Sequence, residues 1–172
     1  AVPLKGTDAH IPRLDELLAT VAGRVPLVLE LKTDWSRRPE PPLVARVAAA
    51  IAGYAGPVAL MSFDPDLVAE VRRLVPERPR GIVADTARHP SEYPGTSPIE
   101  RFALRHLLHA PRTRPDFVAY DVDALPMPGP AILRRMFGKP LLTWTVRTAE
   151  QIRRGRAFAD QLIFENCDPD AA

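Results

Sequence analysis

One short stretch of the chain combines an apolar run with two opposite charges. Residues 25–32 read Val-Pro-Leu-Val-Leu-Glu-Leu-Lys, which is typical of a buried β-strand. Glu30 and Lys32 are two residues apart and therefore share one face of that strand. Burying such charges costs several kcal/mol per ion unless they are paired or bound. The stretch predicts either an internal ion pair or a strand end at solvent, or a site where Glu30 holds a cation and Lys32 an anion.

Length and composition restrict the class of protein to which the chain can belong. With 172 residues, 46% of them hydrophobic and 26% charged, the chain has the size and make-up of one folded domain over 1–172. The basic residues are spread along the chain and aromatic residues make up only 6%, so a nucleic-acid partner is not expected. The single Cys167 excludes an internal disulfide framework and a zinc cluster.

No apolar run approaches the roughly 20 residues of a membrane-spanning helix, so we expect no membrane span. We expect a cytoplasmic protein. Secretion stays open because the chain begins at Ala1-Val2 without a methionine, so the true start is not in view. A homo-oligomer also stays open, because the sequence does not give the oligomeric state.

Apolar strands alternate with helical patterns along the chain. The expected strands cover 25–32, 57–63, 79–84, 115–122, 140–146 and 160–165. The expected helices cover 11–21, 43–54, 65–74, 99–108, 129–137 and 148–158. This alternation predicts an α/β fold with a parallel sheet covered by helices. A closed (β/α)₈ barrel has eight strands in about 250 residues, so six strands predict either a doubly wound open sheet or a barrel whose first part is absent.

Five short motifs follow one another along these elements. They read Ile11-Pro12-Arg13-Leu14-Asp15-Glu16, Glu30-Leu31-Lys32, Ser62-Phe63, Trp144-Thr145-Val146 and Ala159-Asp160. In this order they resemble the glycerophosphodiester phosphodiesterase family, a set of (β/α)₈ TIM barrels. The resemblance covers nearly the whole chain and implies a TIM barrel of which about six strands are present and the N-terminal two are missing.

The resemblance implies metal-assisted hydrolysis of a small-molecule glycerophosphodiester to an alcohol and glycerol 3-phosphate, a reaction of lipid and glycerol metabolism. A divalent cation held by carboxylate oxygens neutralises charge on the phosphate, and a lysine adds a fixed positive charge. Glu30 is therefore expected to bind Mg²⁺ or Ca²⁺, and Lys32 to act as a catalytic residue that contacts the phosphate.

Three further residues are expected around the substrate. Trp144 would line the alcohol side of the pocket and Phe63 would form a neighbouring wall, although plain core packing is the alternative for both rings. Glu165 should lie near the mouth, where it either orders Lys32 or a loop, or stays solvated. The family's frequent threonine-aspartate at the last strand is replaced here by Phe164-Glu165.

The chain also departs from the family pattern. The histidine-arginine-glycine, glutamate-x-aspartate and histidine-aspartate motifs of the family's N-terminal strands are absent. Those strands would hold both catalytic histidines and most of the metal ligands. The four histidines present are read as ordinary loop or helix residues, namely His10, His89, His106 and His109. We therefore expect residues 1–172 alone to be inactive.

Two other functions stay open at this point. One is a catalytically inactive barrel that binds phosphate-bearing ligands or scaffolds a partner. The other is an unrelated phosphate-binding α/β enzyme, such as a sugar-phosphate isomerase. That last class would need a glycine-rich phosphate loop after a late strand, and the sequence shows none.

Overall fold

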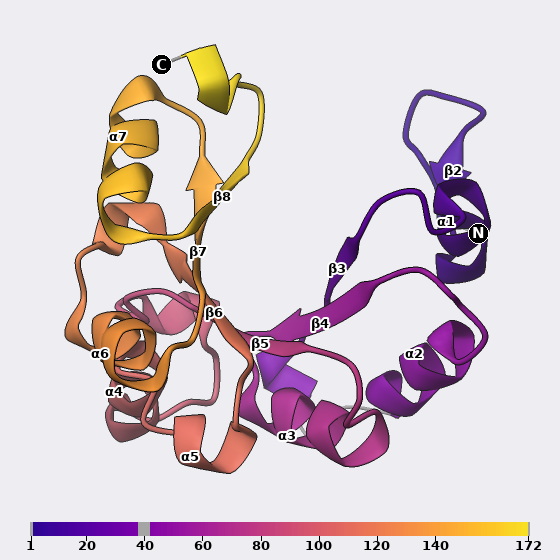
Figure 1. Cartoon of the computed structure of the whole chain (residues 1–172). Helices are drawn as coiled ribbons and strands as arrows, with labels where there is room; N and C mark the ends of the chain where they lie inside the picture. Colours follow the sequence, from indigo (N-terminus) through magenta and orange to yellow (C-terminus); the bar gives the residue numbers. More distant parts are fainter. Residues whose placement is uncertain (1, 38–41, 172) are drawn as a thin grey trace.

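One parallel β-sheet organises the molecule (Figure 1). The computed structural model describes residues 2–37 and 42–171. The sheet contains β3 (Leu27–Glu30), β4 (Val58–Ser62), β5 (Arg80–Ala84), β6 (Phe117–Asp121), β7 (Leu141–Val146) and β8 (Gln161–Phe164). These strands are adjacent in sequence order, and every neighbouring pair is parallel. A doubly wound sheet reverses its strand order at a switch point, so the consecutive order identifies a partial TIM barrel and excludes the doubly wound alternative.

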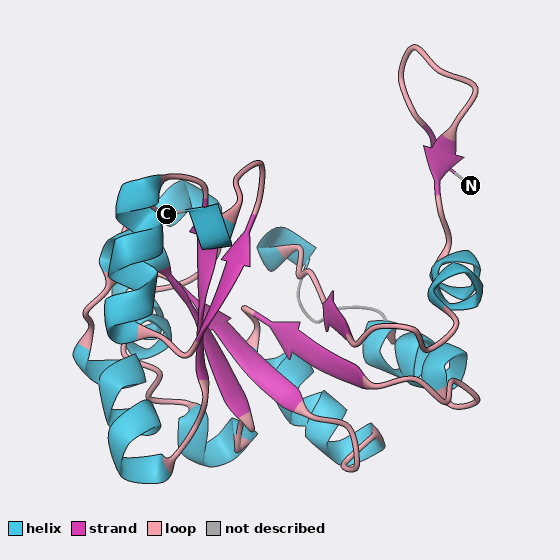
Figure 2. Cartoon of the chain, turned by 45° about the horizontal axis from the view of Figure 1, so that its top comes forward, coloured by secondary structure: helices cyan, strands magenta, loops and turns pink. Residues whose placement is uncertain are grey.

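Helices cover one side of the curled sheet and leave the other side open (Figure 2). They are α1 (Leu14–Val21), α2 (Leu43–Ile51), α3 (Pro65–Leu74), α4 (Pro98–Arg105), α5 (Ala110–Thr113), α6 (Pro128–Phe137) and α7 (Ala149–Phe158). Short 3₁₀ turns lie at η1 (Trp35–Arg37), η2 (Pro90–Glu92), η3 (Val122–Ala124) and η4 (Pro169–Ala171). Within the described ranges, none of the helices has the length and apolar character needed to cross a membrane.

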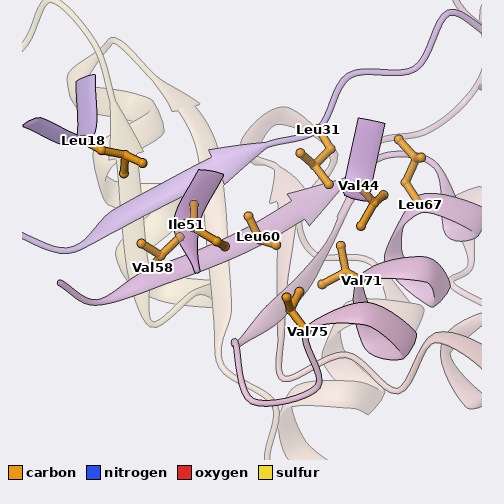
Figure 3. Close-up of a cluster of buried hydrophobic side chains, with 9 residues drawn as sticks. All are labelled: Leu18, Leu31, Val44, Ile51, Val58, Leu60, Leu67, Val71 and Val75. Carbon is orange, nitrogen blue, oxygen red and sulfur yellow. The ribbon is translucent and has the colours of Figure 1, made fainter. Parts of the chain in front are cut away.

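The first part of the core joins β3 and β4 to α1, α2 and α3 (Figure 3). Leu60 of β4 packs with Leu31, and α2 and α3 cover both with Val44 and Val71. Leu27 and Leu29 join the same cluster from its edge. Because side chains alternate along a strand, Val28 and Glu30 lie on the opposite, inner face of the sheet.

The second part of the core lies under α5 and α6. Ile82 of β5, Tyr120 of β6 and Leu141 of β7 are buried there. The Tyr120 hydroxyl lies 2.8 Å from the Asp85 carbonyl oxygen and 2.9 Å from that of Arg105, and its single proton is shared between these two acceptors. This hydroxyl therefore joins the end of β5 to the end of α4.

Side-chain caps start several helices where the sequence offers them. Asp64 accepts a hydrogen bond from the Asp66 N–H at 2.8 Å and begins α3. Ser97 and Glu100 form a capping box at the start of α4. Thr148 begins α7 by accepting from the Gln151 N–H. These polar residues satisfy backbone N–H groups that a helix leaves unpaired.

The sequence predicted the strands of the sheet and the helices between them, but some of the predicted boundaries were wrong. The first helix begins at Leu14 and not at Ile11, because His10–Ile11 forms β2 and pairs antiparallel with β1 (Val2–Pro3). Arg13 is extended at the helix start, where the Glu16 carboxylate accepts from its N–H. The short α5 was not expected, and β3 ends at Glu30, so Lys32 lies in the loop that follows.

Candidate functional site

The carboxyl ends of the strands carry most of the chemically active side chains. The order of the sheet places these ends along one edge, where TIM-barrel active sites are found. The predicted site residues lie near this edge. Glu30 ends β3 and Lys32 lies two residues beyond it, Phe63 follows β4, Trp144 lies within β7, and Glu165 follows β8. Glu30, Phe63 and Trp144 alternate with residues that face the helices, so they lie on the inner face.

Glu30 and Lys32 form an ion pair with each other. The Lys32 Nζ lies 3.4 Å from Glu30 Oε1. The Lys32 side chain is 82% exposed and that of Glu30 is 26% exposed. The pair therefore lies at a strand end that solvent reaches. It is both an ion pair and a solvent-exposed strand end, which were the two simpler alternatives predicted from the sequence. Because an exposed ion pair contributes at most about 1 kcal/mol, an anion can replace Glu30 as the partner of Lys32 at little cost.

Hydrogen bonds between the end of β3 and the end of β4 fix the backbone around this pair. The buried Ser62 hydroxyl donates to the Leu31 carbonyl oxygen at 2.6 Å. The Thr33 hydroxyl donates to the Asp64 carboxylate at 2.9 Å. The Leu31 N–H also donates to the Met61 carbonyl oxygen at 2.7 Å. These bonds hold the residues on both sides of Lys32 while its own side chain stays exposed.

Phe63 and Trp144 meet although β5 and β6 lie between their strands. Their ring centroids are 5.4 Å apart in an edge-to-face arrangement. Phe63 also packs against a cluster that contains Tyr93, whose ring lies 5.4 Å from that of Trp35. The Trp144 indole Nε1 is buried without a hydrogen-bond partner in the described part of the chain. The rings thus form a continuous wall with one unsatisfied donor.

Two aspartates at the same edge were not predicted. Asp85 follows β5 and accepts hydrogen bonds from the Tyr93 hydroxyl at 2.8 Å and the Ala87 N–H at 2.6 Å. Asp121 ends β6 beside Trp144 of β7. Burial raises the pKa of the Asp121 carboxyl; the Asp123 N–H offsets this in part, while the charges of Asp123 and Asp85 add to it. A polar residue that ends an apolar strand, as Glu30 does, is the signal that could have identified Asp121.

Glu165 does not contact Lys32. Its carboxylate accepts from the Arg147 guanidinium at 3.2 Å, and both side chains are about half exposed. Glu165 pairs with Arg147 and Lys32 pairs with Glu30, so of the alternatives for Glu165 the structure favours ordering of a loop or exposure to solvent over contact with Lys32. Glu165 instead links the end of β7 to the end of β8.

The histidines differ from one another in their surroundings. His10 belongs to β2, not to a loop or helix, and its Nε2 lies 3.5 Å from the Glu16 carboxylate. His89 is exposed in the loop before η2. His106 follows α4 and packs on the Phe102 ring. Burial, with the nearby positive charge of Arg112, lowers the pKa of His109 to about 4.

The described residues do not assemble a set of metal ligands. Across 2–37 and 42–171, no group of three His, Cys, Asp or Glu side chains is placed to hold an ion. Glu30 has the right chemistry for one ligand of a hard cation. Its partner in this structure is the Lys32 ammonium group, and the described ranges do not build a coordination shell around it.

Comparisons with known proteins place the fold. No family model and no curated protein sequence matches the chain. A structure from Silicibacter pomeroyi, assigned as a glycerophosphoryl diester phosphodiesterase, matches with 26% identity and a TM-score of 0.67, over 90% of this chain and 53% of that one.

Two further structures agree with this match. A glycerophosphodiester phosphodiesterase from Agrobacterium tumefaciens is 19% identical, with a TM-score of 0.60 over 94% of this chain and 60% of that one. An Oleispira antarctica phosphodiesterase in complex with the product sn-glycerol-3-phosphate is 14% identical, with a TM-score of 0.65 over 90% and 57%. The chain spans between 53% and 60% of the length of these three structures. The resemblance to the glycerophosphodiester phosphodiesterase family, first drawn from five motifs, is therefore confirmed by the Silicibacter pomeroyi structure, and the two less similar structures show the same fold.

Proposed function

We propose that this chain is part of a glycerophosphodiester phosphodiesterase and contributes the phosphate-binding side of its active site. The observation that carries the proposal is the exposed Glu30–Lys32 pair, which lies at the carboxyl end of β3 in a partial TIM barrel. The reaction adds water to phosphorus, breaks the bond between phosphorus and the alcohol oxygen, and yields the alcohol and glycerol 3-phosphate.

Lys32 is proposed to bind the substrate phosphate. Its ammonium group is exposed and leaves its weak contact with Glu30 easily. A phosphodiester carries one negative charge, and more charge gathers on the non-bridging oxygens as water attacks. A fixed positive charge at that position stabilises the transition state more than the substrate, which is the requirement for catalysis.

Glu30 is proposed as one ligand of Mg²⁺ or Ca²⁺. When bound, such an ion would neutralise phosphate charge and orient the phosphate. Glu30 would then turn from Lys32 to the ion. The described residues do not bring three ligating side chains together, so the proposed roles of this chain are to supply the Glu30 oxygen ligand and the neighbouring lysine.

Trp144 and Phe63 are proposed to contact the alcohol part of the substrate. Their edge-to-face contact gives a rigid apolar wall on the inner face of the sheet. The buried Trp144 Nε1–H is a free donor that an oxygen of the substrate could satisfy. Glu165, paired with Arg147, is a more distant candidate at the same edge.

A second candidate function is an inactive barrel that binds phosphate-bearing ligands. It is favoured by one observation, namely that the described residues place no metal-ligand group around Glu30. Lys32 and one carboxylate cannot supply both the acid and the base that hydrolysis requires. Both functions share the phosphate contact at Lys32 and differ in turnover.

The test is release of glycerol 3-phosphate from glycerophosphodiesters by the complete protein. Lys32→Ala should lower turnover at every metal concentration. Glu30→Gln should shift activity to higher Mg²⁺ or Ca²⁺ and be partly rescued by excess ion. Lys5→Ala, which removes an exposed lysine of the N-terminal hairpin loop, is the matched control. Binding without turnover would favour the second function, and identical metal dependence in both variants would show that the assigned roles are wrong.

A further inference from the structure

A groove on the outer layer of the molecule is lined by apolar side chains and lies away from the candidate site. It runs between the α4–α5 segment and α6 and has a volume of about 550 Å³. Leu107 and Leu108 form one wall, and Ile132, Leu133 and Phe137 form the other. Volumes between roughly 300 and 1,000 Å³ with mostly apolar linings are typical of small-molecule sites.

Large apolar side chains stand unusually exposed along this groove. Phe137 is 62% exposed, Leu108 58% and Ile132 46%. Phe102 continues the apolar surface on α4, because its ring contacts His106, which lines the groove. Contiguous exposed apolar surface on a folded domain commonly marks a binding site.

Positive charge gathers at one end of the groove. Arg114 precedes β6 and Lys139 precedes β7, and both line the groove. Neither has an ion-pair partner among the described residues, and no aspartate or glutamate lines the groove. Backbone hydrogen bonds fix their positions: the Arg114 N–H donates to Ala110 at 2.8 Å and the Lys139 N–H to Leu133 at 3.1 Å.

The other end of the groove lies where the start of α6 meets His106. Gly129, the second residue of α6, lies so close to His106 that a Cβ atom there would be 2.8 Å from the His106 carbonyl oxygen. Gly129 and Phe137 are eight residues apart on α6, which corresponds to roughly 12 Å along the helix. The groove therefore runs from the close contact of Gly129 and His106 to a cationic end near Phe137.

From this polarity we propose that the groove binds an anionic amphiphile with a single unbranched chain. The chain would lie along Ile132 and Leu108, and the anionic head would contact Arg114 and Lys139. A second copy of this chain fits less well, because a two-fold interface would bring the same unpaired cations together without carboxylates to offset them. The proposal is independent of the hydrolase function, since the groove shares no residue with the site around Glu30.

The first experiment titrates the complete protein with decanoate, below its micelle concentration, by calorimetry. Decanoate should bind with one site per chain. Butyrate, which lacks most of the apolar chain, and decyltrimethylammonium, which has the opposite charge, should each bind at least tenfold more weakly. Equal affinity for decyltrimethylammonium, or no binding of decanoate, would overturn the proposal.

Variants locate the binding. Arg114→Gln combined with Lys139→Gln should weaken decanoate binding about tenfold, because two charge contacts, one from the exposed Arg114 and one from the half-buried Lys139, are lost. Phe137→Ala should weaken it by loss of apolar contact. The matched control is Lys5→Gln combined with Arg153→Gln, two exposed cations elsewhere. Thermal unfolding would confirm that each variant is folded.

An experiment with lipid vesicles distinguishes binding of a ligand in the groove from binding of the protein to a membrane surface. The same variants are tested for sedimentation with vesicles of phosphatidylcholine, with and without phosphatidylglycerol. Binding to the anionic vesicles without any binding of decanoate would assign the patch to a bilayer and reject the groove as a ligand site. An equal loss of binding in the control variant, Lys5→Gln combined with Arg153→Gln, would show that binding depends only on the overall charge of the protein.

Discussion

The first strand of the sheet, β3, and a middle strand, β5, differ in how far their side chains are exposed to solvent. β3 is an edge strand within the described residues, and Val28 on its inner face is 46% exposed. In β5, Ile82 is 0% exposed, and the strand is buried on both faces. The charged pair therefore stands on the open part of the molecule, and the aromatic wall stands on the packed part. This difference indicates that the two parts have different roles. The packed part provides a fixed apolar surface, and the open part presents an accessible lysine.

The largest effect expected from this comparison concerns packing. Ile82→Ala should lower the free energy of unfolding by about 4 kcal/mol, because a fully buried side chain leaves a cavity. Val28→Ala on β3 should cost about 0.5 kcal/mol, because its side chain is half exposed. Urea denaturation of both variants, with unchanged m-values, measures this. Similar losses in the two would remove the contrast between the strands.

Protonation of His109 should destabilise the packed part at acid pH. Burial lowers its folded pKa to about 4, whereas an unfolded histidine titrates near 6.5. Its contribution is thus fully present above pH ~6.5 and is lost as the pH falls toward 4, at up to about 1.4 kcal/mol per pH unit. His109→Gln should flatten this dependence.

Unfolding free energies between pH 7 and pH 4 check the His109 prediction. His89→Gln, which replaces an exposed histidine, serves as the control and should keep the slope of the parent protein. A slope that survives in His109→Gln would place its origin in another group.

A smaller effect is expected at the bond that fixes β3 to β4. Ser62→Ala removes the donor to the Leu31 carbonyl oxygen and should cost about 2 kcal/mol, because a buried acceptor is left unpaired. Amide exchange at Leu31 should become faster, and exchange at Val118 in β6 should not. Ser97→Ala, which removes a cap of α4, should cost about 1 kcal/mol without altering exchange at Leu31. Unchanged exchange at Leu31 would mean that Ser62 does not hold the site.

The strands followed from local pattern, whereas their order in the sheet and the contacts between them did not. Apolar runs such as 57–63 and 140–146 predicted β4 and β7, because parallel strands are buried on both faces. Nothing in the separate stretches around Phe63 and Trp144 predicted that their rings touch, since that depends on the curl of the sheet. The β1–β2 hairpin was missed because Ile11-Pro12 also suits a helix start, and pairing with Val2 prevailed.

The candidate site was predicted only in part for a similar reason. Glu30 and Lys32 were identified because charge interrupts an apolar run, and in the structure they form an ion pair at the solvent-exposed end of β3. Asp121 interrupts β6 in the same way, with Asp123 two positions further on, but it was read as a strand residue because the two charges have the same sign and do not suggest an ion pair. The Arg147 partner of Glu165 depends on how β7 and β8 end, which no local pattern records.

The most direct test of the account is the affinity of the complete protein for sn-glycerol 3-phosphate, compared between the parent protein and Lys32→Gln. Because Lys32 is 82% exposed, its replacement should change the unfolding free energy by less than about 0.5 kcal/mol. Calorimetry should nevertheless show about tenfold weaker binding, while Lys5→Gln should bind as the parent protein does. Equal affinities for the parent protein and Lys32→Gln would contradict the assignment of the β3 end as the phosphate site.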